Sequence, residues 1–436
     1  MSNFILNTIE KHKTGKPVGV YSVCSANMFV LEASMIHAKE NQNYLLIEAT
    51  SNQVDQYGGY TGMTPSKFIE MIKSLAESVD YPFEFIVLGG DHLGPNVWQN
   101  ENHVVAMKNA EVQIREYVKA GFTKLHLDTS MPCADDKIGL NKMLDAEIIT
   151  ERAARLCKIA EETVCENNIA SKPIYVIGTD VPIPGGSIED LQHIRITPPN
   201  EVEETISLTK KSFLGYGLED AWERTIAIVV QPGVEFSDSS VANYDRSKAV
   251  ELISKINEHD NFVYEAHSTD FQTKASLRQM VEDHFCVLKV GPWLTFAFRE
   301  AVYALAEIES ELCKLNKSYK CSDIRYTLDK VMLENPRYWK KHYTGTKQEI
   351  EFARNYSYSD RIRYYWTSNG ADLALQLLLL NLTRNRIPMN LLSQYLPYEY
   401  DAVCEGKINI LPQELIWHKI KLVLDKYNYA ANGGKK

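Results

Sequence analysis

FEFIVLGGD, at residues 83–91, is a short aromatic and aliphatic run that ends in two glycines and an acid. Seven further runs of this kind occur before residue 293, separated by stretches whose apolar residues recur every three or four positions. They are PVGVYSVC (17–24), NYLLIEAT (43–50), KLHLD (124–128), PIYVIGTD (173–180), TIAIVVQPG (225–233), FVYEAHSTD (262–270) and CVLKVGP (286–292). Nearly continuous apolar runs are typical of parallel strands covered by helices, and eight of them predict an α/β fold, the (β/α)8 TIM barrel. An open doubly wound sheet is the alternative, but no GxGxxG turn follows the first run.

The pattern becomes helical after Pro292, from LTFAFREAVYALAEIESELCKL (294–315) to LIWHKIKLVLDKY (415–427). We therefore expect a barrel over residues 1–310 and a helical C-terminal extension over 311–430 that packs on it. The glycine- and lysine-rich end, 431–436, is expected to be a disordered tail. The extension is expected either to cover the barrel mouth or to form a subunit contact in an oligomer.

Composition and charge exclude several classes of protein. The net charge of −10 provides no basic field for nucleic acid, so no such partner is expected. The eight cysteines include no CxxC pair, which favours reduced thiols in a cytoplasmic protein over a disulfide framework. No apolar run reaches the roughly 18 residues of a membrane-spanning helix, and the N-terminal segment has no secretory apolar core.

Polar side chains stand where almost every predicted strand ends, which is where TIM barrels carry their catalytic residues. They are Glu48, Asp91 with His92, Asp128, Asp180, Gln231, His267 with Ser268 and Asp270, and Lys289. A single acid in such a position is more often a helix cap. Seven strand ends in one barrel nevertheless bring these groups to a common mouth.

His92 and His267 are the best candidates for metal ligands, because imidazole suits zinc and similar divalent ions. A third protein ligand would come from Asp180, our choice, or from Gln231. Asp180 has an alternative use, which is to start the VPIPGGS turn by bonding its own backbone.

Glycines cluster at Gly58–Gly59, at Gly185–Gly186 and at Gly291, and exposed backbone amides in such segments can bind phosphate. Simple turn formation explains each cluster equally well. We place substrate and phosphate binding on Ser268, Lys289, Gly291 and Gln231.

Several of these segments, taken together and in order, closely resemble the GatZ/KbaZ family of tagatose-bisphosphate aldolase subunits. They are SVCSA (22–26), IEATSNQVDQYGGYTGMTP (47–65), LGGDHLGPN (88–96), KLHLDTSM (124–131), YVIGTDVPIPGG (175–186), YEAHSTDFQT (264–273) and LKVGP (288–292). The resemblance covers essentially the whole chain. That family is similar to the zinc-dependent class II aldolases, which implies that Asp91 transfers a proton and that His92 and His267 bind the metal.

Two departures from those patterns affect the implied metal site. Gln231 stands where the class II aldolases carry a sixth-strand histidine, so the ligand set must differ or be incomplete. Asp180 stands where family members usually have glutamate, and its carboxylate is shorter by one methylene group.

The resemblance implies two functions, both in carbohydrate metabolism. One is an accessory subunit that supports a separate catalytic class II aldolase chain. The other is an autonomous, metal-dependent 4-epimerase that acts on tagatose 6-phosphate or a related ketose. Such proteins are also named tagatose-6-phosphate kinases, but the sequence contains no GxxxxGK[ST] phosphate loop.

Chemistry links the aldolase and the epimerase. The ketone of a ketohexose acidifies the proton on C3 but not that on C4, so C4 is inverted most simply by breaking and remaking the C3–C4 bond. We expect Asp91 to act as acid and base on the C4 hydroxyl. Glu48, Asp128 and Asp270 would orient groups or move secondary protons. A Schiff-base aldolase built on Lys289 is the rival, which borohydride trapping would detect.

Overall fold

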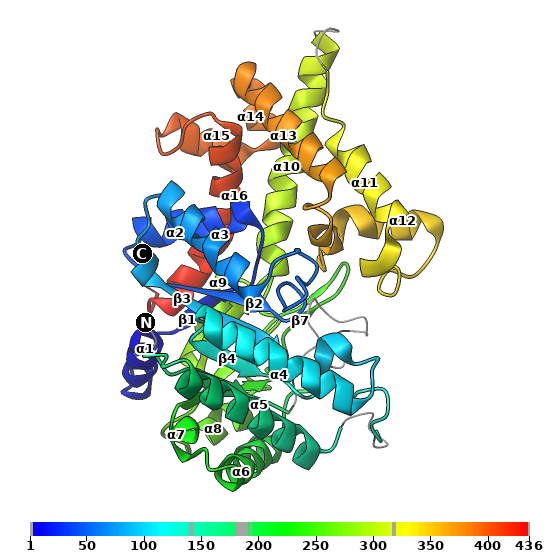
Figure 1. Ribbon diagram of the computed structural model, residues 1–436. Coiled ribbons are helices and arrows are strands. Elements are labelled where there is room, and N and C mark those ends of the chain that lie inside the picture. The colour runs from blue at the N-terminus through cyan, green and yellow to red at the C-terminus, as the bar shows by residue number, and fades with distance from the viewer. Residues whose placement is uncertain are drawn as a thin grey trace.

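Eight parallel strands close into a barrel in a computed structural model, which describes residues 3–138, 144–179, 181, 191, 194–315 and 320–434 (Figure 1). The strands are β1 (Val20–Val23), β2 (Leu45–Thr50), β3 (Ile86–Leu93), β4 (Lys124–Leu127), β5 (Ile174–Ile177), β6 (Thr225–Val230), β9 (Val263–Ala266) and β10 (Phe285–Val290). They pair in chain order, and β10 closes the barrel on β1. The predicted TIM barrel and all eight of its strands are confirmed. A short antiparallel pair after β6, β7 (Glu235–Phe236) with β8 (Val241–Ala242), is an addition that we did not predict.

Helices cover the outside of the barrel between successive strands. They are α2 (Met28–Glu40), α3 (Pro65–Ser78), α4 (His103–Ala120), α5 (Ala146–Glu166), α6 (Pro199–Gly215), α7 (Glu219–Glu223), α8 (Val250–Ile256) and α9 (Lys274–Glu282), with the 3-10 turns η1 (Phe83–Phe85) and η2 (Pro95–Trp98). The outward residues of β2, Leu45, Ile47 and Ala49, belong to the large core that these helices share with the strands. This burial on both faces explains why the strands read as nearly continuous apolar runs.

The side chains inside the barrel change from apolar to charged along its axis. Near the amino ends of the strands it is filled by aliphatic side chains such as Val87 and Val176, and Ile5 and Ile9 of α1 (Asn3–Lys13) pack against them. Near the carboxyl ends it is filled by charged groups. Gly89 of β3 makes room for one of these, because a Cβ at that position would lie 2.7 Å from Cγ of Glu48.

The C-terminal extension is helical and stands over the carboxyl ends of the strands (Figure 1). Its helices are α10 (Pro292–Leu315), α11 (Ile324–Glu334), α12 (Lys347–Tyr356), α13 (Asn369–Arg384), α14 (Met389–Tyr395), α15 (Pro397–Cys404) and α16 (Pro412–Ala431), with the turns η4 (Pro336–Tyr338) and η5 (Arg361–Tyr364). The predicted boundary at residue 310 falls inside α10, because this helix continues from β10 into the extension. α16 returns to pack on α2 and α9, and of the expected tail, residues 432–434 follow it as a turn.

Two further features bear on the sequence-based expectations. Cys313 and Cys321 form a disulfide with their Cα atoms 6.3 Å apart, so the expectation of eight reduced thiols is wrong for this pair. Within the described parts of the chain, no helix combines the length and apolar character needed to cross a bilayer.

Candidate functional site

A cavity opens at the carboxyl ends of the strands, beneath the C-terminal extension. Its inner wall includes Asp91, His92, His267 and Lys289, and its outer wall includes Tyr60, Arg363 and Tyr364. The barrel therefore brings side chains from β3, β10 and the segment after β9 into one space with residues of η5. The positions of the strand ends predicted that Asp91, His92, His267 and Lys289 would meet, but they did not predict the residues of η5.

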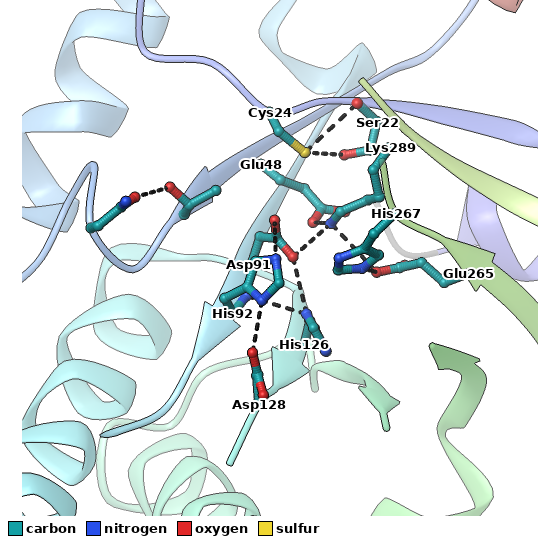
Figure 2. Close-up of polar contacts among 12 residues, drawn as sticks. Ser22, Cys24, Glu48, Asp91, His92, His126, Asp128, Glu265, His267 and Lys289 are labelled. Carbon is teal, nitrogen blue, oxygen red and sulfur yellow. Dashed lines mark hydrogen bonds and ion pairs between the residues drawn. The ribbon is translucent and has the colours of Figure 1, made fainter. Parts of the chain in front are cut away.

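The imidazole rings of His92, His126 and His267 lie close together (Figure 2). Those of His92 and His267 line the cavity. The ring centres of His92 and His267 are 4.8 Å apart, and each lies 5.1 Å from that of His126, on β4. His92 and Ser268 both adopt left-handed backbone angles, with φ of 49° and 52°. Such strained angles in residues other than glycine are typical of functional sites.

Each imidazole is supported by its own carboxylate. Asp128 accepts a hydrogen bond from Nδ1 of His92 (2.7 Å), Asp91 from Nδ1 of His126 (3.0 Å), and Glu265 from Nε2 of His267 (3.1 Å). The backbone N–H of His92 points at Nδ1 of His126 as well, at 3.2 Å, but the charged Asp91 is the stronger partner for that nitrogen. Carboxylates placed in this way fix the tautomer of metal-binding histidines.

The second nitrogens of two of these rings have different surroundings, and Nε2 of His92 lies 3.7 Å from Oδ2 of Asp91. Nε2 of His126 is buried and has no hydrogen-bond partner among the described residues. One ligand atom from each of Asp91, His92, His126 and His267 lies within 4.8 Å of the others. This donor set fits a divalent ion such as zinc, so the cluster could hold a metal. Asp180, the predicted third ligand, lies outside the described residues.

Two buried lysines neutralise the carboxylates of the barrel interior. Nζ of Lys124 lies 2.7 Å from both Glu48 Oε1 and Glu265 Oε2. Lys289 contacts Glu48, Asp91 Oδ1 (2.9 Å) and Glu265 Oε1 (3.4 Å). Burial alone would lower the pKa of Lys289, but Asp91 and its neighbouring acids outweigh it and raise the pKa well above its usual value. A Schiff-base lysine needs a lowered pKa, so this geometry does not favour that rival.

The same charges act on Asp91. Burial would raise the pKa of this carboxyl, but His92, Lys289 and the hydrogen bond from His126 outweigh it and hold the pKa well below its usual value. The carboxylate is therefore ionised near neutral pH. Its Oδ1 contacts His126 and Lys289, whereas Oδ2 lies 3.7 Å from Nε2 of His92 and is the freer oxygen.

Lys124→Met is expected to lower the free energy of unfolding by about 3–5 kcal/mol, because it leaves Glu48 and Glu265 buried with less positive charge. Urea unfolding of the variant beside Lys119→Met measures this difference. Lys119 is an exposed lysine that pairs with Glu116 on α4, and its replacement should change stability by less than about 1 kcal/mol. Equal effects of the two substitutions would show that the buried ion pairs of Lys124 do not contribute measurably to the free energy of unfolding.

The other predicted residues have different surroundings. Ser268 and Gly291 line the cavity. The Asp270 carboxylate accepts the backbone N–H groups of Gly291 (3.0 Å) and Trp293 (2.8 Å), at the start of α10. The Gln231 side chain accepts the N–H groups of Gly233 (2.8 Å) and Val234 (3.0 Å), which shapes a turn outside the cavity lining.

Glu235 faces Ser268 and has a raised pKa. Burial raises its pKa from 4.5 to about 7, against hydrogen bonds from Phe236 and Ser268, and nearby Asp270 adds to the rise. The folded protein thus binds this proton more tightly than the unfolded chain does. The resulting stability is present at low pH and is lost as the pH rises from 4.5 through 7.

Glu235→Gln should therefore raise the free energy of unfolding at pH 8 by roughly 1–3 kcal/mol and change it little at pH 4.5. Denaturant unfolding at both pH values, with the exposed Glu223→Gln as control, measures the effect. A gain of the same size at both pH values would be inconsistent with the raised pKa.

Three important residues were not among those predicted from the sequence: His126, Lys124 and Glu265. His126 and Glu265 precede the predicted Asp128 and His267 by two positions, and Lys124 precedes Asp128 by four, in K-L-H-L-D (124–128) and E-A-H (265–267). Alternate residues of a strand share a face, so His126 with Lys124, and Glu265 with His267, point into the barrel. This alternation was the signal available in the sequence.

Comparisons with known proteins agree with this fold. A structure from Sinorhizobium meliloti 1021, named a "probable tagatose 6 phosphate kinase", is 40% identical, with a TM-score of 0.85 over 94% of this chain and all of that one. The YdjI aldolase from Escherichia coli K12 is 11% identical (TM-score 0.40, 86% of this chain and 95% of that chain). The fructuronate-tagaturonate epimerase UxaE from Cohnella laeviribosi is 12% identical (TM-score 0.48, 95% and 82%). These two likenesses are too weak to bear on activity.

The family comparison covers nearly the whole chain. The model of the family described as D-tagatose-1,6-bisphosphate aldolase subunit GatZ/KbaZ-like matches residues 5–432. This confirms the resemblance seen in the strand-end motifs, and the chain belongs to the GatZ/KbaZ-like family of D-tagatose-1,6-bisphosphate aldolase subunits.

Proposed function

We propose that this chain carries its own site for retro-aldol and aldol chemistry, and that it acts as a 4-epimerase on a phosphorylated ketohexose. The observation that supports this most strongly is the position of Asp91. It lines the cavity beside His92 and His267, and it bonds His126, so a base and a full set of metal donors share one space.

Asp91 would act on the hydroxyl group of C4. Its freer oxygen, Oδ2, takes the hydroxyl proton as the C3–C4 bond breaks, so that C4 becomes an aldehyde and the bonding pair moves to the enediolate of C1–C3. The aldehyde fragment then presents its other face, the C3–C4 bond forms again, and Asp91 returns the proton to the oxygen on C4. Every atom of the substrate is retained, and only the configuration at C4 changes.

A divalent ion, when bound by His92, His126 and His267, would supply Lewis-acid polarisation of the C2 ketone and charge stabilisation, and zinc is the ion we propose. Asp128 and Glu265 would hold two of these rings in the required tautomer. Lys289, which contacts Asp91 and Glu48, would keep Asp91 ionised and hold both carboxylates in place. Glu48 remains a candidate for a secondary proton group.

The second candidate function is that of an accessory subunit which supports a class II aldolase chain. Membership in a family of aldolase subunits is the specific observation in its favour. An accessory role does not require three carboxylate-supported imidazoles around a buried aspartate, and this is why we place the autonomous activity first.

Activity assays of the purified chain, with its metal content measured, distinguish the two functions. We expect the chain to convert tagatose 6-phosphate to fructose 6-phosphate, a reaction that NMR can monitor. This activity should be lost when a chelator removes the metal. Release of triose phosphates from the 1,6-bisphosphate would instead indicate an aldolase. Activity that depends on an added class II partner chain would support the accessory role and overturn our first proposal.

A further inference from the structure

Two cationic side chains line the cavity, Lys289 at its inner end and Arg363 at its outer end. Lys289 is surrounded by Glu48, Asp91 and Glu265. Among the described residues, no carboxylate lies within ion-pair distance of Arg363. Its guanidinium group donates instead to the backbone oxygens of Ser359 and Asp360 (3.1 Å) and to the hydroxyl of Tyr364 (2.9 Å).

The nearest acid to Arg363 in sequence is already neutralised. The carboxylate of Asp360 accepts hydrogen bonds from Nε of Arg299 (2.9 Å) and from Thr295 (2.7 Å). Arg363 therefore presents a positive charge to the cavity with no carboxylate in ion-pair contact, and Asp270, which lines the same cavity, acts on it only from farther away. Its position is fixed by the Tyr364 ring, whose centre lies 4.4 Å from the guanidinium carbon, and Tyr364 in turn stacks on Tyr338 with ring centres 4.8 Å apart.

The position at which TIM barrels often bind phosphate is occupied by the protein itself. That position lies after the last strands, at the amino end of a helix. Here the backbone N–H groups of Gly291 and Trp293 donate hydrogen bonds to the Asp270 carboxylate, so they are not free to donate to a phosphate. Lys289 is already paired with three carboxylates. Among the residues predicted to bind phosphate that line the cavity, this leaves Ser268.

We infer that Arg363, with the hydroxyls of Tyr364 and Tyr60 beside it, binds the C6 phosphate of the substrate and orients the sugar with C1–C4 toward Asp91. This inference rests on the proposed function, and it places a substrate-binding residue in the C-terminal extension. The Tyr60 and Tyr364 rings lie 4.6 Å apart and both line the cavity. A planar guanidinium can bind two phosphate oxygens at once.

The distribution of charge between the two ends of the cavity also bears on how many phosphate groups the substrate carries. At the inner end, Lys124 and Lys289 contact three carboxylates, those of Glu48, Asp91 and Glu265. A phosphate on C1 would find no unpaired cationic side chain at this end among the described residues, and it would compete with the sugar oxygens for the proposed metal ion. The substrate is therefore a ketohexose 6-phosphate in preference to a 1,6-bisphosphate.

Arg363→Gln tests this inference, with Arg337→Gln as the matched control. Arg337 is an exposed arginine of η4, and its side chain lies over Tyr338 outside the cavity lining. Arg363→Gln should lower kcat/KM for tagatose 6-phosphate by about 10- to 100-fold, mainly through KM, because a hydrogen-bonded charge partner is lost. Turnover of unphosphorylated tagatose, which has no such partner, should fall much less than that of tagatose 6-phosphate. Arg363→Lys should recover part of the loss, and thermal melting checks that all variants fold.

Binding measurements separate failure of this inference from failure of the proposed function. Calorimetry with tagatose 6-phosphate should show the same loss of affinity in Arg363→Gln, even if the wild-type chain turns over no sugar. Wild-type turnover with no effect of Arg363→Gln on the phosphorylated substrate would overturn the phosphate site and leave the activity standing. Equal losses on phosphorylated and free tagatose, or tighter binding of the 1,6-bisphosphate than of the 6-phosphate, would also contradict it.

Discussion

Asp91→Asn is expected to lower the epimerase turnover of the metal-loaded chain by about 10²- to 10⁴-fold, the usual contribution of a general acid or base. The amide keeps the shape of the side chain but cannot accept the proton of the C4 hydroxyl. Because Glu48 and Glu265 remain beside Lys289, the fold should survive the change. Steady-state kinetics of kcat, together with the melting temperature of each protein, measure the effect.

The matched control for this substitution is Asp135→Asn. Asp135 is a half-exposed acid that pairs with His103 on the protein surface, outside the cavity lining. It should leave kcat unchanged within about twofold, since surface pairs contribute little. If Asp91→Asn kept more than a tenth of the wild-type turnover, Asp91 would not be the group that moves this proton.

His126→Gln is expected to weaken metal binding by more than about 100-fold, because loss of a group that merely supports a ligand already weakens binding by about 10- to 100-fold. The position of His126 is the reason to count this ring as a ligand, because one of its ligand atoms lies within 4.8 Å of those of Asp91, His92 and His267. Competition against a chromophoric chelator gives the affinity for zinc in the wild type and the variant.

Two further substitutions make this test decisive. His259→Gln is the control, because His259 bonds Glu203 on the outside of the barrel and should not affect the metal. Asp180→Asn tests the ligand that we predicted from the sequence. Full zinc affinity in His126→Gln together with a large loss in Asp180→Asn would assign the third position to Asp180 and remove His126 from the ligand set.

The barrel and the inner half of the site could be predicted because both follow from single strands. Each apolar run gave a strand, and the polar residue at its end gave a group at the mouth, which brought Asp91, His92, His267 and Lys289 together. The inward-facing Lys124 and Glu265 were missed because charged residues inside a strand are rare, and their burial depends on partners from other strands. Only the closed barrel shows that these charges neutralise one another.

The outer half of the site could not be predicted for a different reason. Arg363 lies in a 3-10 turn of the extension, more than 70 residues beyond the last strand, and no periodicity connects it to the barrel mouth. Likewise, Gln231 was expected to bind the substrate, but its side chain bonds backbone N–H groups of a turn outside the cavity lining, and Asp270 lines the cavity while its carboxylate bonds backbone N–H groups at the start of α10. Carboxylates and amides commonly make such local bonds, and a sequence does not show which choice a given residue makes.

The most direct measurement of the central claim is the reverse synthesis of the substrate. The purified, metal-loaded chain is supplied with dihydroxyacetone and glyceraldehyde 3-phosphate, and the products are identified by ¹³C NMR. We predict that both C4 epimers of the ketohexose 6-phosphate form, and that Asp91→Asn abolishes their formation. Interconversion of the two hexose phosphates without any condensation of the trioses would contradict a mechanism that breaks the C3–C4 bond.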